Sequence, residues 1–101
     1  MAERLTLAQQ HYIALIHKDP DSGYGVSFPD VPGVIAAADT LDNALVEAAT
    51  VLGFAFEDWN GPLPVPRDLE ALRSDPDFIE SSRDAVVAAV RPESAVFEAA
   101  Q

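Results

Sequence analysis

The chain has 101 residues, no cysteine, and 17 acidic against six basic residues, which gives a formal net charge of −11. A chain of this length forms a single core, and the lack of cysteine excludes disulfides, thiolate metal sites and a cysteine nucleophile. The negative charge argues against direct binding of DNA or RNA, because such binding depends largely on Lys and Arg. It suits either a basic protein partner or simple solubility.

The first residues show no targeting signal. Residues 1–10 lack the apolar run of a signal peptide, and no window of the chain reaches the roughly 18 apolar residues of a membrane span. We therefore expect a flexible segment at 1–10, a cytoplasmic location and no membrane partner.

Residues 11–19, HYIALIHKD, are predicted to form a first strand with both faces partly covered. Its apolar side chains alternate, with Tyr12, Ala14 and Ile16 on one face and Ile13 and Leu15 on the other. The turn signal PDSG at 20–23 indicates that the second strand returns antiparallel to the first.

The second strand is predicted near 23–29 and ends at a rigid corner. Tyr24, Val26 and Phe28 share one face, as in a half-buried strand. Pro29 cannot donate to a ladder, and Pro32-Gly33 is a turn signal, so a third strand follows at 34–39. Asp30 lies on this corner, either as an ordinary turn residue with local partners or as a contact for a partner protein.

A long amphipathic helix is predicted from Thr40, a plausible N-cap, to the stop signal Gly61-Pro62. Its apolar stripe consists of Leu41, Ala44, Leu45, Ala48, Leu52, Ala55, Phe56 and Trp59. Glycine at position 53 lowers the stability of a helix by about 1 kcal/mol relative to alanine. Its presence there predicts that another backbone approaches the helix closely. Val51 and Phe54 extend the apolar character beyond the stripe and indicate a second contact surface.

The remaining chain supplies an extended proline-rich segment at 61–66, a short helix from Asp68 with Leu69 and Leu72 facing inward, and a last strand at 85–90. The predicted fold class is α+β. Three antiparallel strands and a final strand form the sheet, and one long helix packs across it.

No constellation of residues supports catalysis. Asp19, Asp21, Asp30 and Asp39 could form a carboxylate site for Mg²⁺, but most of them lie in turns, where aspartate bonds the local backbone. His11 and His17 lie too far apart on one strand to share a metal, and Ser81-Ser82 with Asp84 lacks a convincing base. We therefore expect no enzyme, no metal and no cofactor.

Residues 12–48 resemble the HicB-type antitoxin family. The shared features are the tyrosine strand, Gly-Tyr-Gly-Val-Ser-Phe-Pro-Asp, Pro-Gly, and an Asp-Thr-Leu that opens a helix with Ala-Leu-x-x-Ala inside it. The likeness extends over about 11–92 and implies a partial ribonuclease-H-like domain without the nuclease's carboxylates. It also implies a cytoplasmic antitoxin that binds a small basic toxin, HicA, an mRNA interferase with a double-stranded-RNA-binding-like fold.

One feature of many family members is not found. Many members carry a C-terminal helix-turn-helix or ribbon-helix-helix module that binds DNA. Such a module needs basic residues, and this chain has none after Arg91. We therefore expect a C-terminal tail at 93–101 and see no DNA-binding domain: either this member lacks the module, or the sequence is part of a longer chain.

Three hypotheses remain. In the first, an antitoxin masks its toxin with a surface that contains Asp30, Glu47, Phe54, Glu57 and Asp58. In the second, an orphan HicB-like module has no toxin and forms a dimer or tetramer through Val51 and Phe54. In the third, a hydrolase depends on Asp19 or Asp21, and for this one we expect no Mg²⁺-dependent nuclease activity.

Overall fold

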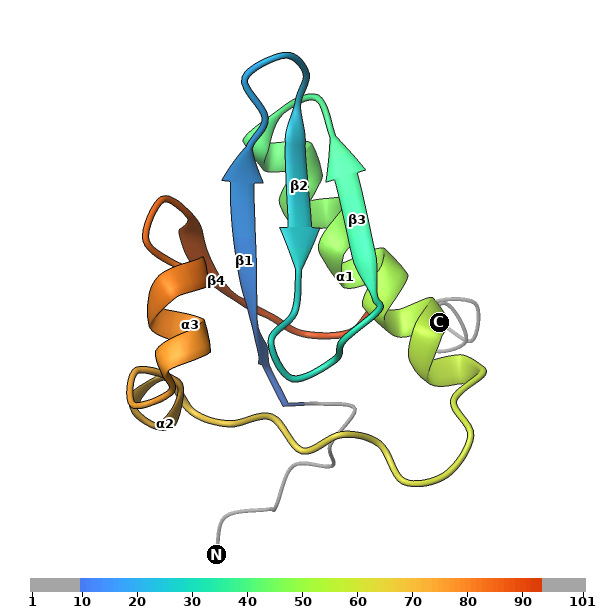
Figure 1. Ribbon diagram of the computed structural model, residues 1–101. Helices are drawn as coiled ribbons and strands as arrows, with labels where there is room; N and C mark the ends of the chain where they lie inside the picture. Colours follow the sequence, from blue (N-terminus) through green and yellow to red (C-terminus); the bar gives the residue numbers. More distant parts are fainter. Residues whose placement is uncertain (1–9, 94–101) are drawn as a thin grey trace, which may run out of the picture.

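The computed structural model describes residues 10–93 and confirms the α+β class (Figure 1). In chain order the elements are β1 (Tyr12–Lys18), β2 (Tyr24–Ser27), β3 (Ile35–Ala38), α1 (Leu41–Glu57), α2 (Leu69–Leu72), α3 (Pro76–Ser81) and β4 (Val86–Val90). The flexible start predicted at 1–10 and the C-terminal tail predicted at 93–101 lie outside the described residues, except for residues 10 and 93.

The four strands form one antiparallel sheet in the order β3-β2-β1-β4. The last strand of the described chain therefore pairs with the first one, and Tyr12 lies opposite Val90. Ile16 lies opposite Val26, and Val26 opposite Ala36, so these side chains share the face that α1 covers. The alternation predicted for the first strand is confirmed.

Helix α1 packs on one face of the sheet and forms the main core. Thr40 caps it, because its Oγ1 accepts a hydrogen bond of 3.1 Å from the backbone N–H of Asn43. The buried side of the helix presents Ala44, Ala48 and Leu52. They pack against buried residues of the strands and of the corner, namely Tyr12, Ala14, Ile16, Val26, Phe28, Val31 and Val90.

The helix ends earlier than the sequence pattern predicted. Its last residue is Glu57, so Trp59 lies beyond the helix. Trp59 stays partly buried, because its ring meets the edge of Phe56 at a centroid distance of 5.7 Å and its Nε1 donates to the carbonyl oxygen of Pro62. Leu45, which we placed on the inward stripe, is exposed at the helix flank.

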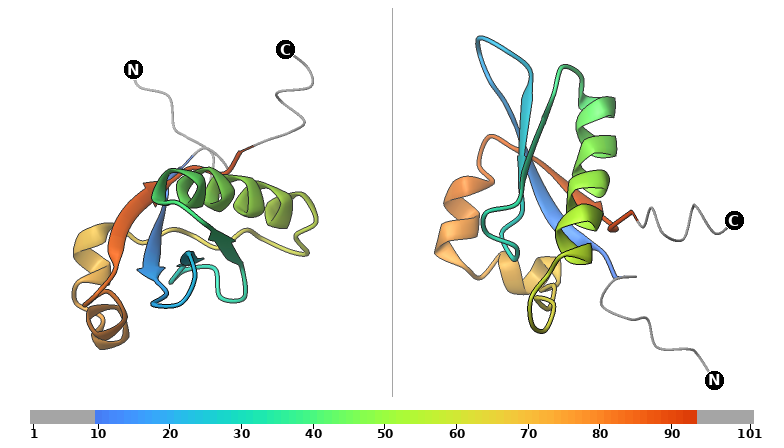
Figure 2. Two further views of the ribbon diagram at one scale, coloured as in Figure 1. Left: turned by 90° about the horizontal axis from the view of Figure 1, so that it is seen from above. Right: turned by 90° about the vertical axis from the view of Figure 1, so that its right-hand side faces the viewer.

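On the opposite face of the sheet, α2 and α3 pack against Leu15 of β1 and form a second, smaller core (Figures 1 and 2). We predicted one short helix from Asp68, and the structure has two. The break follows from Asp75-Pro76: the Asp75 carboxylate caps α3 by accepting from the backbone N–H of Asp77, and Pro76 suits the first turn of a helix.

The corner after β2 forms as predicted. The backbone N–H of Val34 donates to the carbonyl oxygen of Val31 at 3.3 Å, and Gly33 at the turn has φ 94°, which only glycine adopts at little cost. Regular pairing of β2 ends at Ser27, two residues before Pro29. Pro32-Gly33 therefore sets the direction in which β3 returns.

Candidate partner-binding surface

Four of the five candidate residues lie together on the outer side of α1 or at its end. Glu47, Phe54, Glu57 and Asp58 are all exposed to solvent. An α-helix turns by about 100° per residue, which places Glu47, Phe54 and Asp58 within about 40° of one another and Glu57 beside Phe54. The sequence thus brings an aromatic ring and three carboxylates to one side of one helix.

Phe54 is unusually exposed for its type. Its side chain is 56% accessible, and Val46, two turns earlier on the same side, is 59% accessible. Exposed large apolar side chains that are rimmed by charge commonly mark interaction sites. The second contact surface that we expected from Val51 and Phe54 is reduced to Phe54, because Val51 is partly buried against the core.

The charge around this surface has one sign. Between Asp19 and Pro66 the chain has eight carboxylates and no Lys, Arg or His. This stretch includes β2, β3 and α1, whereas four of the six Lys and Arg residues lie between Arg67 and Arg91. The α1 side of the molecule is therefore suited to a cationic partner and poorly suited to an anionic one.

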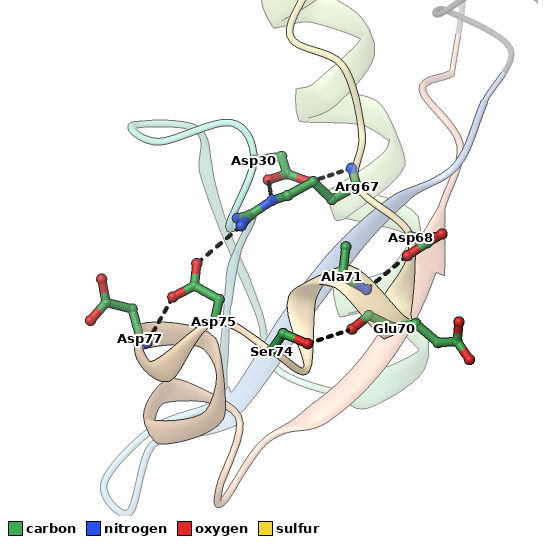
Figure 3. Close-up of polar contacts among 8 residues, drawn as sticks. All are labelled: Asp30, Arg67, Asp68, Glu70, Ala71, Ser74, Asp75 and Asp77. Atoms are coloured by element: carbon green, nitrogen blue, oxygen red, sulfur yellow. Dashed lines mark hydrogen bonds and ion pairs between the residues drawn. The ribbon is translucent and has the colours of Figure 1, made fainter.

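Asp30 does not join this surface. Its side chain is only 9% accessible, and its two carboxylate oxygens accept from the backbone N–H and the Nε of Arg67, both at 2.7 Å (Figure 3). Arg67 Nη1 also donates to Asp75 Oδ2 at 3.0 Å. Asp30 therefore has a long-range partner within the chain, where we expected either local partners or a partner protein, and it ties the corner to the end of the proline-rich segment.

The same ion pairs shift the proton affinities of their members. The pKa of Arg67 lies above its ordinary value, chiefly because its guanidinium donates hydrogen bonds to Asp30 and Asp75. The pKa of Asp75 is held below its ordinary value, first by Arg67 and then by the backbone N–H of Asp77. Burial raises the pKa of Tyr12, and the carboxylate of Asp30 adds to that rise.

Asp19, one of the carboxylates considered for catalysis, serves the local backbone. Asp19 Oδ1 accepts from the backbone N–H of Asp21 at 3.0 Å, in the turn between β1 and β2. Within residues 10–93, no three His, Asp or Glu side chains are grouped closely enough to hold a metal ion. Nor does any helix in that range have the length and apolar character needed to span a membrane.

Comparison with known proteins decides the family. A family profile described as "HicB_like antitoxin of bacterial toxin-antitoxin system" matches residues 12–99, most of the chain. The chain belongs to the HicB-like antitoxin family. The resemblance inferred from the Gly-Tyr-Gly-Val-Ser-Phe-Pro-Asp run and the Asp-Thr-Leu helix start is confirmed.

Two relatives match part of this HicB-like chain. Antitoxin HicB 1 of Photorhabdus laumondii is 32% identical over 68 residues, which are 64% of this chain and 44% of that protein. An uncharacterised 14.9 kDa protein from the rep-hol intergenic region of Haemophilus phage HP1 is 34% identical over 61 residues, 57% of this chain and 46% of that protein. The matched stretches cover less than half the length of these curated relatives.

Solved structures show the same fold. The N-terminal domain of Burkholderia pseudomallei antitoxin HicB has a TM-score of 0.64 at 26% identity, over 82% of this chain and 98% of that one. The longer HicB structure from the same organism has a TM-score of 0.60 at 27% identity, over 79% of this chain and 61% of that one. A chain of a HicA3–HicB3 toxin–antitoxin complex has a TM-score of 0.64 at 24% identity, over 82% of this chain and 98% of that one.

Proposed function

We propose that this HicB-like chain is the antitoxin of a type II toxin–antitoxin pair, and that it binds and masks a small basic HicA-like mRNA interferase in the cytoplasm. The observation that carries the proposal is the outer side of α1, where Phe54 is exposed among Glu47, Glu57 and Asp58. Family membership supports the antitoxin role, since the family is described as antitoxins of bacterial toxin–antitoxin systems.

The chemistry of this surface fits a protein that acts on RNA. An mRNA interferase needs a cationic surface to hold phosphates, and carboxylates on α1 would compete for that surface. Phe54 would supply the apolar anchor, because buried aromatic residues at the centre of an interface contribute most of the binding energy. The chain needs no catalytic group for this role, since it acts by covering the toxin.

The footprint that we propose omits a direct contact from Asp30. Its carboxylate is occupied by Arg67, so it supports the fold below the corner and leaves Glu47, Phe54, Glu57 and Asp58 as the contact residues. No direct binding of nucleic acid by this chain is part of the proposal, because the described α1 side repels phosphate.

Co-expression with the neighbouring small reading frame tests the function. The adjacent product should arrest growth, the full chain should rescue it, and Phe54→Asp should fail to rescue. Ile79→Asp is the matched control, because Ile79 is also an exposed apolar residue on a helix but lies on α3. A harmless adjacent product, or a Phe54→Asp chain that rescues fully, would refute the proposal.

Salt dependence tests the electrostatic part. Binding measured by calorimetry should weaken by about tenfold or more between low and high salt, because the charge pairs at a solvated rim are screened. Glu47→Gln combined with Glu57→Gln should flatten this dependence, whereas Asp77→Asn on α3 should leave it unchanged. An affinity that is independent of salt would contradict the proposed role of the carboxylates.

A second candidate is an oligomerising module without a toxin, as a dimer or tetramer. The exposure of Phe54, and of Ile35 at 71% on β3, favours this alternative. Light scattering of the isolated chain should then give a dimer or tetramer that Phe54→Asp dissociates. A wild-type chain that scatters as a monomer would exclude it.

A further inference from the structure

The chain that follows β4 is fastened across α1. The backbone N–H of Glu93 donates to the carbonyl oxygen of Ala49 at 3.0 Å, and the Thr50 hydroxyl donates to Glu93 Oε1 at 2.9 Å. Figure 2 shows the end of the described chain, in red, reaching the helix after it leaves the sheet. The segment 91–93, which we call the strap, therefore joins the sheet to the middle of α1.

Gly53 makes this crossing possible. A Cβ at that position would overlap the carbonyl oxygen of Glu93 and lie 2.8 Å from its carbonyl carbon. No side chain fits in that space, since both obstructing atoms belong to the backbone. The close approach predicted from a glycine inside a helix is confirmed, and the strap is the backbone that approaches.

The strap crosses a ridge of the helix that carries exposed apolar side chains. Val46, Thr50 and Phe54 follow one another at four-residue spacing and so line one ridge. The strap is bonded to Thr50 in the middle of this ridge, and Val46 and Phe54 remain exposed on either side of it. The crossing divides one apolar surface into two.

Releasing the strap leaves few groups of α1 without a partner. The Thr50 hydroxyl has a second acceptor, the carbonyl oxygen of Val46 at 3.1 Å, which it can use when Glu93 departs. The carbonyl of Ala49 lies in the regular part of the helix, where it accepts from the backbone four residues later. The polar groups of Glu93 would bond water instead, so the contacts can open without a buried unsatisfied group.

We propose that the strap is an autoinhibitory device with a closed and an open state. In the open state, the half-buried Ala49 and Thr50 and the buried Gly53 become more accessible and join Val46 and Phe54 in one continuous, largely apolar surface. The inference rests on the proposed function in one respect, that this side of α1 engages the partner. A basic partner that covers the whole ridge then has to displace Glu93, so the strap lowers its affinity.

Gly53→Ala in the full chain tests the device without any partner. The added methyl group should push Glu93 away, so that its amide exchanges with solvent about tenfold faster by NMR, and the neutral apolar dye Nile red should fluoresce more strongly on the variant. Gly25→Ala is the matched control, because a Cβ there meets no atom within 4 Å. Thr50→Val removes the hydroxyl contact with little change in shape and should give a smaller change in the same direction.

The outcomes separate the two proposals. Unchanged exchange of the Glu93 amide in both Gly53→Ala and Thr50→Val would overturn the strap, whether or not the neighbouring toxin binds. Faster exchange in either variant, with no binding of any adjacent basic protein, would support the closed and open states of the strap, but would refute the antitoxin function and with it the inhibitory role. If Gly53→Ala does not fold, Thr50→Val and Glu93→Ala decide the question by the same measurement.

Discussion

The two faces of the sheet are held in different ways. On the α1 face, ten buried apolar residues of the described chain form one cluster; on the α2–α3 face, Leu15, Leu72 and Phe78 form a second, smaller one. The smaller cluster is joined to the rest by polar contacts, chiefly those of Arg67 with Asp30 and Asp75. The comparison teaches that apolar burial holds α1, whereas charge and helix capping position α2 and α3.

Charge divides the molecule in a similar way. The charged side chains in the stretch with β2, β3 and α1 are all carboxylates. Residues 67–91, in contrast, contain four Arg as well as six acidic residues. The acids of α2 and α3 are used locally: Asp68 and Asp75 cap helices, and Asp75 also pairs with Arg67. The carboxylates of α1 form no ion pair and cap no helix within residues 10–93, so they are available to another molecule.

The largest effect should come from the main core. Leu52→Ala removes a fully buried side chain and should lower the free energy of unfolding by about 3 kcal/mol or more. Leu72→Ala should cost less, about 2 kcal/mol, because its cluster has three buried side chains and is walled by two short helices that can move to close part of the cavity. Urea unfolding of both variants checks the order, and a larger loss for Leu72→Ala would reverse our comparison.

A smaller effect should follow from removing the guanidinium that joins the corner to α3. Arg67→Ala removes the charged partner of the Asp30 carboxylate and leaves it the backbone N–H of residue 67, so the melting temperature should fall, though less than in Leu52→Ala. Amides of α2 and α3 should exchange faster, while those of α1 stay protected. Arg67→Lys, which keeps the charge but not the two-sided geometry, should restore only part of the loss.

The pH dependence of stability should reveal Asp75. Its pKa is depressed in the folded protein, so its contribution is present above the unfolded value near 3.8 and is lost as the pH falls through the lower folded value. Asparagine at position 75 can still cap a helix, but Asp75→Asn should have a lower free energy of unfolding than wild type at pH 7. This difference in stability should disappear below about pH 4. Asp77→Asn is the control. A difference in stability between Asp75→Asn and wild type that persists at pH 2 would contradict the role of the Asp75 charge.

The smallest effect on stability should come from the partner surface itself. Phe54→Asp changes an exposed side chain two residues from Leu52 and should leave the free energy of unfolding within about 0.5 kcal/mol of wild type. The same variant should abolish toxin rescue, which would separate binding from folding on one helix. A marked loss of stability in Phe54→Asp would show that Phe54 belongs to the core.

Most of the fold could be predicted because its signals are local. Strand alternation around Tyr12 and Val26, the Thr40 cap and the Pro32-Gly33 turn each depend on a few neighbouring residues. The pairing of Asp30 with Arg67 could not be predicted, because the two residues lie 37 positions apart and nothing in their neighbourhoods links them. Asp75-Pro76 did signal the start of α3, and that signal was missed.

The candidate surface, too, has features that could be predicted from local sequence and features that could not. The exposure of Glu47, Phe54 and Glu57 follows from the helical period, which the sequence contains. Gly53 predicted that another backbone approaches, but only the three-dimensional path of the chain after β4 identifies Glu93 as that backbone. Local periodicity predicts which side of an element faces out, whereas contacts between distant segments need the structure.

The pairing of β4 with β1 has a consequence for synthesis on the ribosome. Tyr12 finds its neighbour Val90 only after β4 has been synthesised and has left the exit tunnel, so the sheet cannot close before that point. Until then β1 has an open edge, and the nascent chain is exposed to proteases for longer than a protein with early local pairing. A copy whose synthesis stops before β4 therefore keeps an unpaired edge on β1 and cannot complete its sheet.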